Sequence, residues 1–85
     1  MATKYTSPAE IISTLTETMP KIFCRKNIES LTGGLMTYGT QKNLDSAQDG
    51  PKRFRMGKKV AYLKDDYLLW FETYLAERWQ DATNA

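Results

Sequence analysis

The chain of 85 residues has one cysteine, Cys24, and no histidine, which excludes an internal disulfide and leaves the usual zinc ligand sets incomplete. Its hydrophobic content of 41% is enough for one compact core, so wholesale disorder is not expected. No stretch approaches the roughly 18 apolar residues of a membrane span, and the polar N-terminus lacks the core of a signal peptide. We therefore expect one small cytoplasmic domain.

The residues also argue against an enzyme. Without histidine, a metal-ligand cluster or a glycine loop that cradles phosphates, the usual catalytic constellations cannot be assembled. Gly33 and Gly34 lack the lysine and the spacing of a nucleotide-binding loop. Cys24 is expected to be a small buried apolar residue rather than a nucleophile. We predict neither catalysis nor a cofactor.

The charges are distributed unevenly along the chain. The net charge is only +2, but residues 21–64 carry ten basic and three acidic residues, which gives +7. Residues 65–85 carry one basic and five acidic residues, which gives −4. Such an asymmetry is typical of a protein with one face that binds a polyanion, although a solvated charged surface is the alternative.

The first predicted helix covers residues 7–19. Ser7 is a good N-cap, Pro8 suits the first helical position and Glu10 completes a capping box. One face of this helix is apolar, and Pro20 ends it. We divide the chain into a tail with an accessory helix (1–20), the main domain (21–79) and a polar tail (80–85). The first helix packs either on the last helix or on a second subunit.

Two helices joined by a glycine turn are predicted next. The first covers residues 25–31, and Gly33 and Gly34 end it, with Leu35 filling the space between the helices. Thr37 caps the second helix, which extends to about Ala47. On this second helix we expect Thr40, Leu44 and Ala47 to face the core and Tyr38, Gln41, Lys42 and Asp45 to point away, Asp45 restraining Lys42 or Arg25.

The period then changes to that of β-strands. Polar and apolar residues alternate in the segments 53–56 and 60–63. Gly57, Lys58 and Lys59 supply a tight basic loop between the two segments. Asp65 and Asp66 suit the start of a last helix that extends to about Trp79. The aromatic side chains of this helix belong to the core or to an oligomer interface, and we favour the core. The predicted fold is mainly α with a small two-stranded β-hairpin.

The order helix, turn, helix, basic hairpin, helix resembles the winged helix-turn-helix domains of phage excisionases and AlpA-like regulators, within the MerR-like group. The resemblance covers about residues 22–75. It depends on Thr32-Gly33-Gly34-Leu35, Thr40 with Asn43-Leu44-Asp45-Ser46, Gly50-Pro51, Arg55-Met56-Gly57-Lys58-Lys59-Val60-Ala61-Tyr62 and a helix centred on Trp70. The polar Gln41, the residue Gly39 and the extra first helix depart from the family pattern.

The resemblance implies sequence-specific binding of double-stranded DNA by a recognition helix and a basic wing. The protein would then be an excisionase (recombination directionality factor) of a phage or mobile element, or a small transcription regulator, in a bacterial cell or a phage-infected host. An integrase and further copies of the chain on DNA are possible partners. The candidate DNA-binding residues are Arg25, Lys26, Thr37, Tyr38, Gln41, Lys42, Lys52, Arg53, Arg55, Lys58 and Lys59.

One alternative from another class of function remains. The same scaffold can serve as a protein-interaction module that does not bind DNA, which exposed aromatic residues would favour and the segregated charges disfavour. The residues do not distinguish an excisionase from a transcription regulator, because both need the same contacts to DNA.

Overall fold

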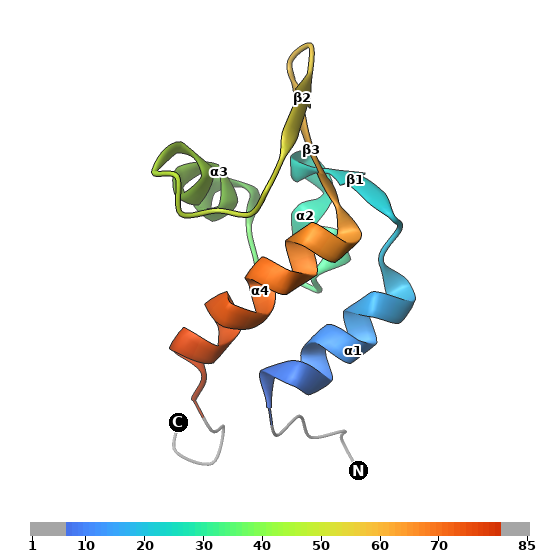
Figure 1. The fold of residues 1–85 in the computed structure, drawn as a ribbon, viewed down its shortest axis with the longest axis vertical. Coiled ribbons are helices and arrows are strands. Elements are labelled where there is room, and N and C mark those ends of the chain that lie inside the picture. The colour runs from blue at the N-terminus through green and yellow to red at the C-terminus, as the bar shows by residue number, and fades with distance from the viewer. Residues whose placement is uncertain (1–6, 81–85) are drawn as a thin grey trace.

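The computed structural model describes residues 7–80, which form helices and a small sheet (Figure 1). The predicted tails 1–6 and 81–85 lie outside the described residues. The elements in chain order are α1 (Pro8–Thr18), β1 (Ile22–Cys24), the short 3-10 helix η1 (Arg25–Asn27), α2 (Ile28–Leu31), α3 (Tyr38–Ser46), β2 (Phe54–Met56), β3 (Lys59–Leu63) and α4 (Lys64–Arg78).

Helix α1 packs beside α4, which answers the question of its position (Figure 1). Leu15 and Met19 are buried in the shared core, and the Lys64 Nζ atom donates a hydrogen bond of 3.0 Å to the Thr16 carbonyl oxygen. Pro8 lies in the first turn, as predicted, but the side chain of Ser7 makes no cap hydrogen bond. The fixed φ of Pro8 and the missing N–H of Pro20 are thus the local signals for this helix.

The sheet has three antiparallel strands rather than the two predicted, in the order β1-β3-β2. The β2–β3 hairpin is confirmed, and β1 adds to the other edge of β3, with Phe23 opposite Tyr62. A run of three residues is too short to show strand alternation in the sequence, so β1 was not predicted.

An aromatic cluster forms the centre of the core. The ring centroids of Phe23, Tyr62 and Tyr67 lie 5.3 to 5.6 Å from one another, and the Phe71 ring lies 5.3 Å from that of Tyr67. Tyr62, Tyr67 and Phe71 are completely buried. Burial of each such ring contributes about 1.5–3 kcal/mol, which a domain of this size needs. The rings of α4 therefore serve mainly the core.

The turn between α2 and α3 differs from the prediction in one residue. Gly33 and Gly34 have φ angles of +63° and +89°, the left-handed conformation expected of glycine here. Leu35, predicted to fill the space between the helices, is 52% exposed, and Met36 is buried instead. The Met36 N–H donates to Thr32 Oγ1 across 3.1 Å, which holds the residue after Leu35 against the core.

None of the helices within residues 7–80 has the length and apolar character needed to cross a membrane bilayer.

Candidate nucleic-acid interface

Helix α3 begins as predicted. The Thr37 Oγ1 atom accepts a hydrogen bond of 3.2 Å from the Thr40 N–H, and its hydroxyl donates to Thr40 Oγ1 across 3.0 Å. This cap fixes the first turn and leaves Tyr38 43% exposed beside it. The Arg25 guanidinium lies 5.5 Å from the centre of the Tyr38 ring. The first turn of α3 thus presents a hydroxyl and an aromatic ring to solvent.

The inward face of α3 is not the predicted one. Gln41 and Asp45 are buried, with exposed fractions of 0% and 2%, whereas Thr40 and Ala47 are exposed and Leu44 is only half-buried. The expectation that Gln41 and Asp45 point away from the core is therefore wrong. The two polar residues lie one turn apart, so they occupy the same face of the helix.

Hydrogen bonds explain why these polar side chains are inside. Tyr67 donates to Gln41 Oε1 across 2.9 Å, and the Gln41 Nε2 atom donates to Asp45 Oδ1 across 3.1 Å. The other carboxylate oxygen, Oδ2, accepts from the Tyr62 hydroxyl at 2.5 Å and from Arg25 Nη1 at 3.1 Å. We call these five residues the Asp45 network. It joins α3 to η1, β3 and α4 and gives its buried polar groups hydrogen-bond partners, except that the Arg25 Nε atom is buried without one.

The titration behaviour of the Asp45 network follows from its burial. Burial raises the pKa of Tyr62 well above its ordinary range, and the hydrogen bond and charge of Asp45 raise it further. Burial likewise raises the pKa of Tyr67. Burial alone would lower the pKa of Arg25, but the hydrogen bond to Asp45 and the neighbouring tyrosines outweigh it and raise that pKa. Both phenols thus stay neutral and the guanidinium stays charged.

Two of the predicted DNA-binding arginines have internal partners. The Arg25 side chain is only 13% exposed and is paired with Asp45, so of the two predicted partners of Asp45 it is Arg25 that the carboxylate restrains. Arg53 is half-buried, and its Nη2 atom donates to the Asp45 carbonyl oxygen at 2.7 Å. Its Nη1 atom donates to the Pro51 carbonyl oxygen at 3.2 Å. Arg53 therefore fastens the start of the hairpin to the end of α3.

The remaining predicted residues are exposed, and all of them except Thr37 and Lys52 line two neighbouring hollows. Lys42 of α3 and Arg55 of β2 line the first hollow, between the helix and the hairpin. Tyr38 of α3 and the hairpin residues Lys58 and Lys59 line the second. Arg25 and Val60 border both hollows, which are therefore contiguous. We name the exposed members of this group the basic surface: Lys26, Thr37, Tyr38, Lys42, Lys52, Arg55, Lys58 and Lys59.

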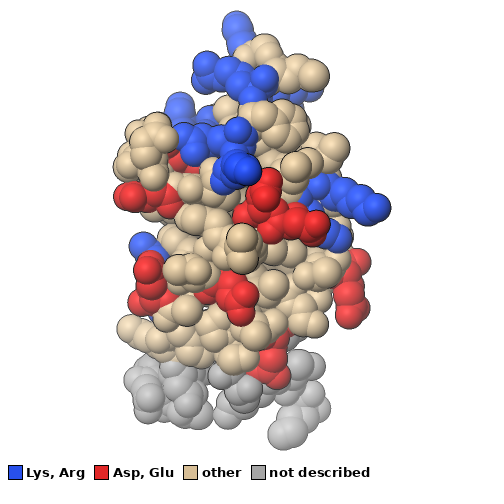
Figure 2. All heavy atoms as spheres, viewed as in Figure 1, with Lys and Arg blue, Asp and Glu red and all other residues tan. Residues whose placement is uncertain are grey.

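The charges of the folded chain are separated along its long axis. In Figure 2 the lysine and arginine side chains gather at the hairpin end, and acidic side chains occupy the middle and lower parts of the same view. Asp65 and Asp66 lie in the first turn of α4, where the helix dipole favours carboxylates, as predicted. The positive potential is thus concentrated on the end that holds the basic surface.

The outer part of the hairpin, residues 54–59, has little support from the rest of the chain, whereas Val60, Ala61 and Tyr62 of β3 are buried. Residues 54–59 are all exposed, and in Figure 1 the β2–β3 loop extends beyond the other elements. Gly57 has a φ angle of +63°, which allows the tight turn at the tip. The sequence therefore builds an exposed cationic arm that contributes little to the core.

The sequence predicted the contact of Asp45 with Arg25 as one of two alternatives, but not the rest of the Asp45 network. Its only local signal is a glutamine four residues before an aspartate, and the other members are distant in sequence. Comparison of the chain with known protein families, with curated proteins and with solved structures found no match.

Proposed function

We propose that the chain binds double-stranded DNA, with α3 as the recognition helix and the β2–β3 hairpin as a basic wing. The observation that supports this most strongly is the meeting of α3 and the hairpin at shared hollows. Lys42 lies on one hollow with Arg55, and Tyr38 lies on the other with Lys58 and Lys59. A helix that enters the major groove beside a cationic finger on the adjacent phosphates needs this arrangement.

The buried position of Gln41 changes which side chains are available to bases. Gln41 is fully committed within the Asp45 network, so the proposal no longer includes it as an adenine contact. Tyr38 and Lys42 are the two long exposed side chains on the first half of α3, where the shorter Thr40 is also exposed. Lysine favours guanine or a phosphate, and the Thr37 hydroxyl with the first N–H groups of α3 suits a phosphate.

Within this proposal, α2, the glycine turn and α3 form a winged helix-turn-helix of the excisionase or AlpA-like type. The protein then acts either as a recombination directionality factor, with an integrase and further copies of itself, or as a small transcription regulator. A single module of this kind covers roughly 600–1,000 Å² of protein surface, so several binding sites would be needed for tight occupancy.

A gel-shift titration at two salt concentrations tests the proposal. Each neutralised phosphate contributes about 0.9 to the slope of log affinity against log salt. Four contacts then weaken binding on the order of 100-fold between about 50 and about 200 mM salt. Excess unrelated duplex as competitor measures sequence specificity. Absence of a shift at the lower salt concentration would refute DNA binding.

One observation favours the protein-interaction alternative. Ile22 and Leu63 are directly opposite each other on the sheet and are 59% and 45% exposed, and Leu69 on α4 is 75% exposed. Apolar side chains of this kind suit a protein partner. The same titration separates the two functions, because a protein-interaction module gives no DNA shift at either salt concentration.

A further inference from the structure

The tip of the hairpin carries an apolar side chain that phosphate binding does not explain. Met56, the last residue of β2, is 76% exposed, the largest value among the exposed large hydrophobic residues of the described chain. Leu69 on α4 is exposed to nearly the same extent, at 75%. Because single exposed apolar residues are common, the surroundings of Met56 must decide whether it has a role.

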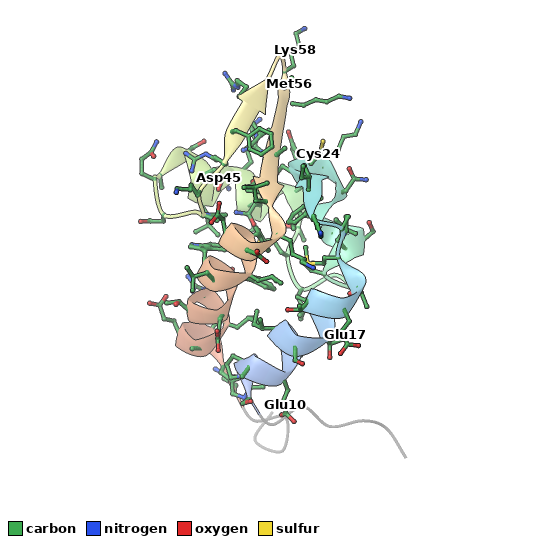
Figure 3. All side chains as sticks on the ribbon, turned by 45° about the vertical axis from the view of Figure 1, so that its right-hand side comes forward. Glu10, Glu17, Cys24, Asp45, Met56 and Lys58 are labelled. Atoms are coloured by element: carbon green, nitrogen blue, oxygen red, sulfur yellow. The ribbon has the colours of Figure 1, made fainter. Side chains whose placement is uncertain are left out.

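The surroundings of Met56 are cationic. Met56 lies directly opposite Lys59, so the two side chains stand next to each other on one face of the hairpin. Arg55 precedes it, and Lys58 follows the turn at Gly57. In Figure 3, Met56 and Lys58 lie together at the end of the hairpin, away from Asp45. The tip is thus an apolar side chain flanked by positive charges.

This combination favours nucleic acid over a protein partner. The buried centre of a protein interface is depleted of charged residues, whereas Met56 lies opposite Lys59 and within two residues of Arg55 and Lys58. A duplex offers phosphates to these cations and a stack of apolar base faces to the methionine. Lys59 also lines the hollow that Tyr38 borders, which connects the tip to the basic surface.

We infer that Met56 is an apolar wedge that enters the minor groove and partly unstacks one base step, while Lys58 and Lys59 bind the phosphates beside it. The inference depends on the proposed DNA binding and adds a deformation of the DNA to it. Proteins that insert apolar wedges in this way kink the duplex by about 20–90°. The flexible pyrimidine–purine steps, such as TA, are the preferred sites because they unstack most easily.

The test uses two end-labelled duplexes of about 30 base pairs that have a central TA step and are identical except at that step. One duplex is fully paired, and the other carries a mismatch at that step, where stacking is already broken. Affinity comes from fluorescence anisotropy and bending from energy transfer between the ends. Wild-type protein is expected to bend the paired duplex and to bind the mismatched one about tenfold more tightly.

Four variants separate the wedge from the charges. Met56→Ala is expected to lose the bend and the preference for the mismatch while it keeps the salt dependence, and Met56→Leu retains both. Lys58→Ala with Lys59→Ala weakens binding to both duplexes equally and keeps the preference. Leu69→Ala, the control of matched exposure on α4, resembles wild type.

The two proposals fail in different ways. If wild-type protein binds neither duplex, DNA binding itself is refuted and the wedge with it. If it binds both duplexes equally and without bending, and Met56→Ala behaves the same, the wedge is refuted while DNA binding stands.

Discussion

Tyr62 of β3 donates a hydrogen bond of 2.5 Å to Asp45 Oδ2, and this contact ties the hairpin to the C-terminal end of α3. Neither side chain belongs to the basic surface. Arg53 reinforces the connection, since its Nη2 atom donates to the Asp45 carbonyl oxygen. The angle between helix and hairpin is therefore set by buried polar contacts behind the surface that we propose to bind DNA.

Gln41 and Lys42 are neighbours in sequence with opposite expected roles. Gln41→Ala removes a partner of both Tyr67 and Asp45, and each buried group left unsatisfied costs about 1–3 kcal/mol. Lys42→Ala changes an exposed side chain and alters the free energy of unfolding by no more than about 0.5 kcal/mol. Urea denaturation measures both values. If Lys42→Ala is the more destabilising change, the assigned orientation of α3 is wrong.

Stability is expected to fall in alkali because of Tyr62 and Tyr67. The pKa of each phenol is raised above its ordinary value of 10.0 in the folded chain. This contribution is fully present below pH 10 and is lost as pH rises toward the folded pKa, because the unfolded chain releases the protons first. The limiting slope is about 1.4 kcal/mol per pH unit for each phenol.

Comparison with Tyr62→Phe isolates the contribution of Tyr62, since the variant lacks only the hydroxyl of this phenol. Urea unfolding at a series of pH values above 9 is expected to give a shallower decline for Tyr62→Phe than for wild type, by up to about 1.4 kcal/mol per pH unit. Parallel curves would show that Tyr62 ionises as easily in the folded chain as in the unfolded one.

Two glycines near α3 are expected to respond oppositely to alanine. A Cβ atom at Gly50 would clash with the Asp45 carboxylate, and such overpacking typically costs about 1–3 kcal/mol. A Cβ atom at Gly39, in the first turn of α3, meets only open space. Gly39→Ala therefore stabilises the helix by up to about 1 kcal/mol. Thermal melts of the two variants test the difference, and equal shifts in Tm would argue against the packing of Gly50 on Asp45.

The elements of the fold were predictable where the signal is local. Pro8 and Pro20 bracket α1, Thr37 caps α3, and Gly57 turns the hairpin. Each of these residues acts through its own backbone geometry or a bond to a residue a few positions away, so the sequence contains the necessary information.

The inward face of α3 was not predictable in the same way. Pattern analysis places polar residues in solvent, and it placed Gln41 and Asp45 there. Their burial depends on Tyr62 and Tyr67, which follow 17 and 26 residues after their respective partners. A single sequence does not reveal such distant pairs. The cations of residues 52–59 were easier to place, because five charges in eight residues cannot all be buried, and four of the five are exposed.

The most direct test of the account compares two charge-matched double variants in salt-dependent binding to duplex DNA. Lys58→Ala with Lys59→Ala removes two cations from the hairpin, and Lys21→Ala with Arg78→Ala removes two exposed cations outside the basic surface. We expect the first pair to weaken binding and to reduce the salt slope by about 1.8, and the second pair to change neither appreciably. Equal losses in both pairs, or unchanged affinity in the hairpin pair, would contradict the proposed DNA-binding surface.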